Sequence, residues 1–363
     1  MKALNLNESA MLPAMTARGC TARLKALMRR AEAGEPITIG TLGGSITEGA
    51  KADCIENRYA SRVAAWWRNT FPKSEITLVN AGIGATGSAI GVFRLERDLL
   101  SRKPDLTIIE YAVNDAGKKN ADLSETYESI VRRCLQSGAA VMLLFLPRQA
   151  HEDASPAQRM IGHHYNLPMI SIVDALEPCF EDGTLQWSDY GADGVHPNSD
   201  GHRMIADLIG SFLESVRIDR RDESDFPLPP VMTSEIYRNA DLFGSDELTP
   251  VSFGSFTANP DSFRQFRNGW TSAAPGEPII FELNCRTAML LIHRSIKPSA
   301  GTAKAVVEAD GQTTEYEMNA FFENGWGDYA LEVPVFRSEM TKKIRISVYD
   351  TDRAFTLLRV MFA

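Results

Sequence analysis

The sequence predicts an α/β domain with a doubly wound parallel sheet, a three-layer sandwich, followed by an antiparallel β-sandwich that resembles a jelly roll. Up to residue 216, apolar strand-like runs alternate with segments of helical periodicity, which implies parallel strands joined by crossover helices. After residue 250 the runs become short, β-rich and separated by turn residues. Between these regions, charge and proline replace periodicity in RRDESDFPLPP, residues 220–230, as is typical of a domain boundary. We therefore expect two domains, residues 1–222 and residues 223–363.

In the first domain, the predicted strands alternate with predicted helices along the chain. The strands are continuously apolar, as expected for a parallel sheet that is covered by helices on both faces. We predict strands over residues 37–43, 75–80, 105–113, 139–146 and 168–174. We predict helices over residues 23–34, 59–71, 91–102, 123–138, 156–166 and 199–216.

In the second domain, short β-rich runs are separated by turn sequences such as ADG, ENGWGD and KPSAG. These runs predict strands over residues 278–283, 287–295, 303–309, 329–336, 343–350 and 355–362. The region spans about 110 to 130 residues, which is a usual size for one sandwich.

The composition excludes several classes of protein. The net charge is −9 and no block of Lys or Arg stands out, so a nucleic-acid partner is not expected. The most apolar run, residues 139–147, is far shorter than the roughly 18 to 20 residues that cross a bilayer, so no membrane partner is expected either. The first nineteen residues are interrupted by Asn, Glu and Pro and show no export signal.

The cysteines suggest neither a disulfide framework nor a zinc site, because they are odd in number, scattered and never spaced as CxxC. They are Cys20, Cys54, Cys134, Cys179 and Cys285. Together with the missing export signal, they predict a cytoplasmic protein.

Chemistry-bearing residues follow several of the predicted strands, where open parallel sheets bind ligands. Ser45 follows the first strand in GGSITEG, on a tight turn whose glycines allow close approach, and could be a nucleophile or simply a helix cap. The glycine-rich stretch NAGIGATGS, residues 80–88, follows the second strand, and Asn114 follows the third. Backbone N–H groups and a side-chain amide at these positions could stabilise an oxyanion.

Asp193 lies three residues before His196 in the stretch SDYGADGVHPNSDGHRMIA. Within one turn, the carboxylate can reach Nδ1 of the imidazole and leave Nε2 free to act as a base. A hydroxyl nucleophile needs such a base, and the base needs such an orienting group. Ser45, His196 and Asp193 therefore predict a nucleophilic hydrolase.

A dinucleotide site is the alternative interpretation of the glycines, since Gly82, Gly84 and Gly87 have GxGxxG spacing and Glu110 could bind a ribose. That interpretation leaves Ser45 and the pair Asp193/His196 without a role. It also places the fingerprint on the second strand rather than the first.

The ordered set GGSITEG, NAGIGATGS, YAVND and DGVHP resembles the four sequence blocks of the SGNH (GDSL-like) hydrolase superfamily, whose fold is flavodoxin-like. The resemblance implies a Ser45–His196–Asp193 triad. It implies oxyanion donors from the Ser45 backbone, the glycine loop and the Asn114 side chain, with no metal or organic cofactor.

Three positions depart from the family pattern. Gly44 stands where the family has the Asp of GDS, which is outside the triad, and Ala112 stands where the third block has Gly. Counted from Asn80, the glycine donor of the second block falls on Ala85 rather than Gly84, so either residue could supply the N–H group.

The two-domain architecture is similar to that of carbohydrate esterase family 17 acetylmannan esterases, which carry a C-terminal family 35-type carbohydrate-binding module. This similarity implies removal of O-acetyl groups from manno-oligosaccharides. Trp326 in FFENGWGDY could stack on a sugar or lie in the sandwich core, and Arg58 and Tyr190 could contact substrate or pack structurally.

The alternatives to an acetyl esterase are a carbohydrate-binding protein without activity and a lipase-like enzyme for another acyl chain. The sequence decides neither which sugar and hydroxyl are deacetylated nor the oligomeric state. It also leaves open whether the second domain closes over the site or carries a structural cation.

Overall fold

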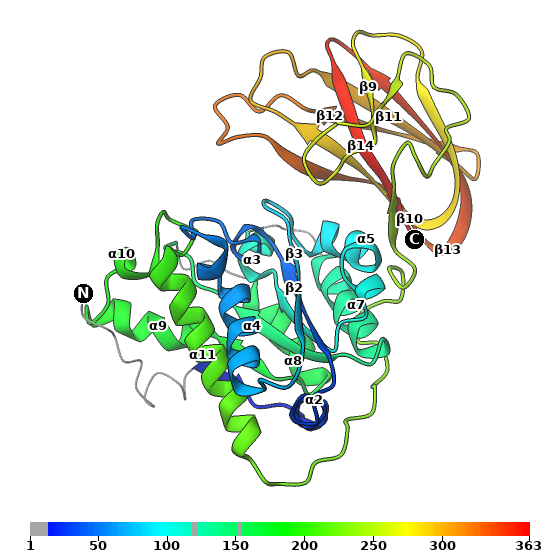
Figure 1. Ribbon diagram of the computed structural model, residues 1–363. Helices are drawn as coiled ribbons and strands as arrows, with labels where there is room; N and C mark the ends of the chain where they lie inside the picture. The colour runs from blue at the N-terminus through cyan, green and yellow to red at the C-terminus, as the bar shows by residue number, and fades with distance from the viewer. Residues whose placement is uncertain (1–13, 118–121, 151–153) are drawn as a thin grey trace. The chain divides into compact units, whose positions relative to one another are not determined.

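The computed structural model describes residues 14–117, 122–150 and 154–363 (Figure 1). The chain forms two compact units. Unit 1 comprises residues 1–91 and 95–234, and unit 2 comprises residues 92–94 and 235–363. Most of the segment searched for an export signal lies outside the described residues.

Unit 1 is built on a six-stranded sheet with the order β1-β6-β5-β4-β2-β3. All neighbouring pairs are parallel except β1 with β6, which is antiparallel. The strands are β1 (Met15–Ala17), β2 (Ile37–Gly43), β3 (Ile76–Gly82), β4 (Leu106–Glu110), β5 (Ala140–Phe145) and β6 (Met169–Ser171). The central strands β4 and β5 are buried along their whole length, as the continuous apolar runs predict.

Helices cover both faces of this sheet, which confirms the doubly wound α/β fold (Figure 1). One hydrophobic cluster joins the sheet to α2, α4, α9 and α11, and α8 packs on the opposite face against Leu143. The longer helices are α2 (Ala22–Glu32), α4 (Tyr59–Thr70), α5 (Ser88–Asp98), α7 (Asp122–Gln136), α8 (Ser155–His164), α9 (Ile172–Glu181) and α11 (Ser199–Ile218). The short ones are α3 (Ser45–Glu48), α6 (Ala112–Asp115), α10 (Trp187–Tyr190) and the 3₁₀ turns η1 (Ile55–Asn57) and η2 (Leu100–Arg102).

Two predicted strands of unit 1 are shorter than expected. The strand predicted over 105–113 ends at Glu110, and the strand predicted over 168–174 ends at Ser171. Ser171 caps the following helix, because its hydroxyl accepts the backbone N–H of Asp174 at 3.0 Å. The residues that follow each strand are therefore helical.

The segment predicted as a linker is bound to unit 1. We call residues 219–233 the strap. Lys25 Nζ donates to the carbonyl of Arg221 at 2.6 Å, and Arg132 Nη1 donates to the carbonyl of Pro229 at 2.6 Å. Buried Glu128 accepts the backbone N–H groups of Met232 and Thr233 at 2.6 and 2.7 Å. The strap is therefore part of unit 1.

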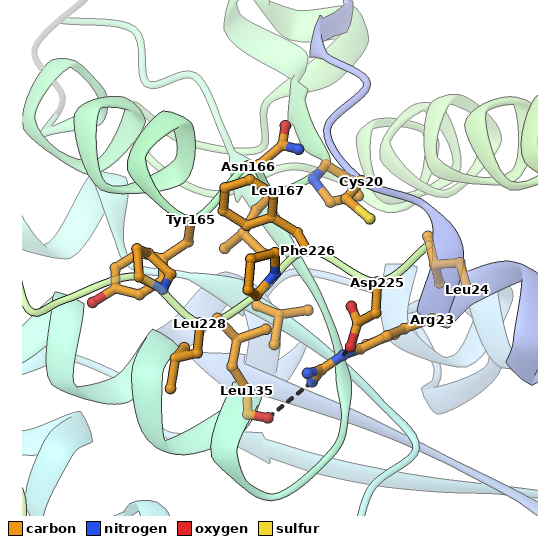
Figure 2. Close-up of a pocket in the computed structure, with 15 residues that line it drawn as sticks. Cys20, Arg23, Leu24, Leu135, Tyr165, Asn166, Leu167, Asp225, Phe226 and Leu228 are labelled. Atoms are coloured by element: carbon orange, nitrogen blue, oxygen red, sulfur yellow. Dashed lines mark hydrogen bonds and ion pairs between the residues drawn. The ribbon is translucent and has the colours of Figure 1, made fainter. Parts of the chain in front are cut away.

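The middle of the strap also lines a pocket (Figure 2). Phe226 and Leu228 lie beside Leu135 and Tyr165 there. The residues that begin β5 and precede β6 also line it, together with the start of α2, so the pocket lies at the amino ends of these strands.

Unit 2 is an eight-stranded antiparallel sheet with the order β12-β11-β13-β10-β14-β9-β8, and β7 pairs with β14. The strands are β7 (Asp241–Phe243), β8 (Thr257–Asn259), β9 (Gly269–Ser272), β10 (Ile279–Arg294), β11 (Thr302–Ala309), β12 (Gln312–Asn319), β13 (Tyr329–Asp350) and β14 (Phe355–Phe362). The strands predicted over residues 278–283 and 287–295 therefore form one continuous strand, β10. Those predicted over residues 329–336 and 343–350 likewise form one strand, β13.

The two long strands give unit 2 its two layers. The ladder between β10 and β13 is interrupted between Cys285 and Thr287, and only the second half of β10 pairs with β14. Trp270 of β9 packs edge-on against Phe281 in the first half of β10, with ring centroids 5.2 Å apart. Because β9 belongs to the β14 side of the sheet, this contact closes a sandwich around a core that contains both rings.

Among the described residues, no helix combines the length and apolar character needed to cross a bilayer. All five cysteines are free thiols.

Candidate active site

The carboxyl ends of three parallel strands meet at one edge of unit 1. Gly43, the last residue of β2, is in register with Gly82 of β3 and with Glu110 of β4. The turn with Ser45, the glycine loop and the segment with Asn114 follow these three strands directly. The loop between α10 and α11 brings His196 to the same edge.

Ser45, His196 and Asp193 form a chain of hydrogen bonds. Ser45 Oγ lies 2.9 Å from His196 Nε2. His196 Nδ1 lies 3.0 Å from both carboxylate oxygens of Asp193. The structure thus brings together the three residues predicted as a triad, in the order that a hydroxyl nucleophile, its base and the orienting carboxylate require.

The turn around Asp193 stabilises its charged form. Burial would raise the pKa of Asp193, but the backbone N–H groups of His196 and Val195 and the imidazole outweigh it and lower the pKa to about 2. The carbonyl of Asp193 also accepts the indole N–H of Trp187 at 2.8 Å. The carboxylate is therefore ionised at neutral pH and held against the imidazole.

Gly44 fits a space that no other residue can occupy without displacing Asn114. A Cβ atom at position 44 would lie 1.9 Å from Asn114 Oδ1 and 3.2 Å from Nδ2. The amide of Asn114 therefore lies directly beside the residue that precedes Ser45. The Asp that the family pattern has at position 44 would collide with this amide.

The glycine loop presents its two candidate N–H groups differently. The Gly84 N–H donates to Oε2 of Glu48 at 2.9 Å. Ala85 adopts a left-handed backbone conformation, with φ of 61°. Within the described parts of the chain, the N–H groups of Ala85 and Ser45 and the side-chain amide of Asn114 have no hydrogen-bond partner.

The three predicted substrate contacts lie in different environments. Arg58 packs on the end of the Ser45 turn, where a Cβ atom at Gly49 would lie 2.2 Å from its Cδ. Trp326 is 69% exposed, so it is not a core residue. Tyr190 is 0% exposed and packs against Phe180 and Trp187, so its side chain has no surface to offer a substrate, which corrects that expectation.

Trp326 belongs to an aromatic cluster of unit 2. Its ring stacks on Tyr329, with centroids 5.0 Å apart and an interplanar angle of 26°. Phe322 packs edge-on against both rings. The Arg294 guanidinium lies 4.7 Å from the centroid of the Phe322 ring.

Two carboxyl groups at the site have positions that the sequence analysis did not predict. Glu48 accepts a hydrogen bond from the Gly84 N–H group, and Glu110 is fully buried behind the Ser45 turn. A signal existed for Glu110, because an acid at the end of the apolar run LTIIE is unusual in a buried strand. In the described ranges, no three His, Cys, Asp or Glu side chains are grouped as metal ligands.

Comparison with known proteins places this geometry in a family. Residues 41–204 match the GDSL-like Lipase/Acylhydrolase family. The crystal structure of a two-domain esterase active on acetylated mannans is 32% identical and aligns with a TM-score of 0.89 over 97% of this chain and 98% of that one. A second structure, of such an esterase co-crystallised with mannopentaose, is also 32% identical and aligns at 0.88 over 97% of each chain.

No curated protein matches the sequence significantly. The family match covers the four blocks that carry Ser45, Ala85, Asn114 and His196, and the structural relatives extend the similarity over both units. The chain therefore belongs to the GDSL-like lipase/acylhydrolase family and is an esterase.

Proposed function

We propose that the protein removes O-acetyl groups from carbohydrates, specifically from acetylated manno-oligosaccharides. The observation that carries this proposal is the Ser45–His196–Asp193 chain of hydrogen bonds. The choice of substrate is supported by the 32% identity, over nearly the whole length, to an esterase active on acetylated mannans.

In the proposed reaction, Ser45 Oγ attacks the acetyl carbonyl carbon while His196 Nε2 takes the hydroxyl proton. The bond between the acetyl carbon and the sugar oxygen then breaks, and His196 returns the proton to that oxygen. Water attacks the acetyl-enzyme, again with His196 as base, and acetate leaves Ser45. Asp193 orients the imidazole and stabilises its charged form throughout.

We assign the oxyanion to three donors, the N–H groups of Ser45 and Ala85 and the amide of Asn114. All three lack a partner within the described residues, so they cost no existing hydrogen bond when the oxyanion forms. Gly84 is the less suitable donor, because its N–H group is already bound to Glu48. The left-handed conformation of Ala85 places a strained residue at the site, which is common where backbone geometry serves catalysis.

We assign sugar binding to Trp326 and Arg58. An exposed indole that is backed by Tyr329 offers a flat apolar face to a pyranose ring. The Arg58 side chain lies at the end of the turn that carries Ser45, and we expect its guanidinium to donate to a substrate hydroxyl. Unit 2 would then act as a carbohydrate-binding module.

The test is acetate release from acetylated manno- and xylo-oligosaccharides by the wild type, Ser45→Ala and the exposed control Ser101→Ala. Release from the manno series by the wild type and Ser101→Ala, but not by Ser45→Ala, would support both the nucleophile and the substrate. Release from the xylo series alone would reject acetylated manno-oligosaccharides as the substrate. Binding of both series without release would reject the esterase mechanism in favour of a binding protein.

A further inference from the structure

Glu110 is a fully buried acid directly behind the nucleophile turn, and the proposed acyl transfer leaves it without a role. It ends β4 in register with Gly43, two residues before Ser45. Its Oε2 accepts the hydroxyl of Thr47 at 3.3 Å, and that hydroxyl also lies 2.8 Å from the hydroxyl of buried Tyr59. The carboxyl therefore contacts the turn that carries Ser45.

The same carboxyl faces the segment that carries Asn114. The backbone N–H groups of Val113 and Gly44 both point toward it and favour its charged form. These two donors are looser than standard hydrogen bonds, since Glu110 Oε1 has no partner of standard geometry in the described structure. The Glu110 side chain thus lies against Gly44 and Thr47 of the Ser45 turn and against Val113, the residue before Asn114.

This position matters because the turn of Ser45 and the side chain of Asn114 are in close contact. The amide of Asn114 lies so close to Gly44 that even a Cβ atom there would be 1.9 Å from it. A shift of about 1 Å between a nucleophile and an oxyanion donor can cost about 10²-fold in rate. Whatever fixes the turn against the Asn114 segment therefore also fixes the reaction geometry.

Retaining a buried acid here is costly for the fold. Burial and the neighbouring carboxyl of Asp115 disfavour its charge, and its carboxyl also interacts with buried tyrosines, which carry no positive charge. These tyrosines are Tyr59, Tyr127 and Tyr190. A leucine or methionine would fill the space at lower cost, so the contacts to the Ser45 and Asn114 segments are what the carboxyl adds.

We propose that Glu110 is a positioning residue that holds the turn of Ser45 against the segment of Asn114. The inference rests on the proposed function, in which Ser45 is the nucleophile and Asn114 is an oxyanion donor.

The experiment measures kcat and KM for p-nitrophenyl acetate in Glu110→Gln, Asn114→Ala and the double variant. Glu110→Gln should lower kcat at least about tenfold with little change in KM. In the Asn114→Ala background the same substitution should lower kcat much less, because the group that it positions is gone. A merely structural role would give the same factor in both backgrounds.

Glu128→Gln is the matched control, because Glu128 is another buried acid of unit 1 but contacts the strap. It should leave kcat unchanged in folded protein. If Glu110→Gln does not fold, Thr47→Val removes the direct hydrogen bond to Glu110 and is measured in the same two backgrounds.

A kcat within twofold of the wild type, or equal factors in the two backgrounds, would overturn the positioning role. Ser45→Ala separates the two proposals. An inactive Ser45→Ala with an unaffected Glu110→Gln rejects only the positioning role, whereas an active Ser45→Ala rejects the proposed function itself.

Discussion

In unit 1, Ser45, His196 and Asp193 are held together by hydrogen bonds of 2.9 and 3.0 Å at one edge of the sheet, whereas in unit 2 Trp326 is 69% exposed on a turn. The first arrangement suits bond-making, which depends on angles and distances between a few atoms. The second suits contact with a flat sugar surface, which depends on accessible apolar area. The contrast predicts that substitutions of the triad and of the oxyanion donors act on kcat and that substitutions of the aromatic cluster act on KM.

The largest effect is expected from Asp193→Asn. Asn Oδ1 can still accept the N–H groups of Val195 and His196, but its NH₂ group then faces Nδ1 and favours the wrong tautomer of the imidazole. We expect kcat for p-nitrophenyl acetate to fall about 10³- to 10⁴-fold. Asp200→Asn, an exposed carboxylate on α11, is the control, and a loss below tenfold would contradict the role of Asp193.

Asn114→Ala should come next, with a loss in kcat of about 10²- to 10³-fold and a nearly unchanged KM. The amide is the side-chain donor of the proposed oxyanion site, so its loss should raise the barrier to the tetrahedral intermediate. Steady-state hydrolysis of p-nitrophenyl acetate measures both constants, with the exposed Asn69→Ala as control. A rise in KM alone would move Asn114 from catalysis to substrate binding.

Glu110 should make the stability of unit 1 depend on pH. Burial, aided by Asp115, raises the pKa of Glu110 from 4.5 to about 7. Between these values the folded state keeps a proton that the unfolded chain has lost, so the free energy of unfolding should fall as the pH rises through this window. Gln does not titrate, so the free energy of unfolding of Glu110→Gln should not show this fall. Between pH 5 and pH 8 the difference between the variant and the wild type should therefore change in favour of the variant by up to about 3 kcal/mol.

Urea unfolding followed by the helical circular dichroism of unit 1 measures this difference. Glu128→Gln should give the opposite sign, and only at acid pH, as the pH falls through the unfolded value of 4.5. Burial would raise the pKa of Glu128, but hydrogen bonds from Thr233, Tyr165 and Met232 lower it, so the stabilisation from Glu128 is lost as the pH falls. Parallel pH curves for the wild type and Glu110→Gln would show that Glu110 does not titrate in this window.

The smallest effect is expected in unit 2. Trp326→Ala should raise KM for acetylated manno-oligosaccharides about 3- to 10-fold, the size of one aromatic contact, and leave hydrolysis of p-nitrophenyl acetate unchanged. Met340→Ala removes another apolar side chain of the same unit, one that is 65% exposed. It should change the kinetic constants for neither substrate. A fall in kcat for p-nitrophenyl acetate in Trp326→Ala would contradict the prediction that the aromatic cluster of unit 2 acts on KM alone.

The features that the sequence predicted well are those that depend on local pattern. The strand over residues 37–43 has the predicted bounds, because its apolar run is long and ends at glycines. Ser45, Asp193 and His196 could be selected because their chemistry requires a nucleophile, a base and an orienting group together. The strand predicted over residues 168–174 missed a local signal of the same kind, a Ser at 171 followed three residues later by Asp, which caps the helix there.

The features that the sequence did not predict depend on contacts between distant residues. The burial of Tyr190 results from packing against Phe180 and Trp187, which no periodicity reveals for a helix of four residues. The engagement of Gly84 by Glu48 joins residues that follow different strands. The strand β1 is only three residues long and pairs with a strand more than 150 positions away, so its sequence carries almost no signal.

The strap has a practical consequence for anyone who separates the two units. A truncation after residue 222 would follow the proline-rich boundary in the sequence but would discard the donors that satisfy buried Glu128 and the carbonyl that binds Arg132. The isolated fragment would keep a buried carboxylate whose remaining donor is the Tyr165 hydroxyl, and an open apolar groove, which invite aggregation. A cut after Ser234 keeps these groups paired, so the place where the protein can be divided is set by its hydrogen bonds rather than by its prolines.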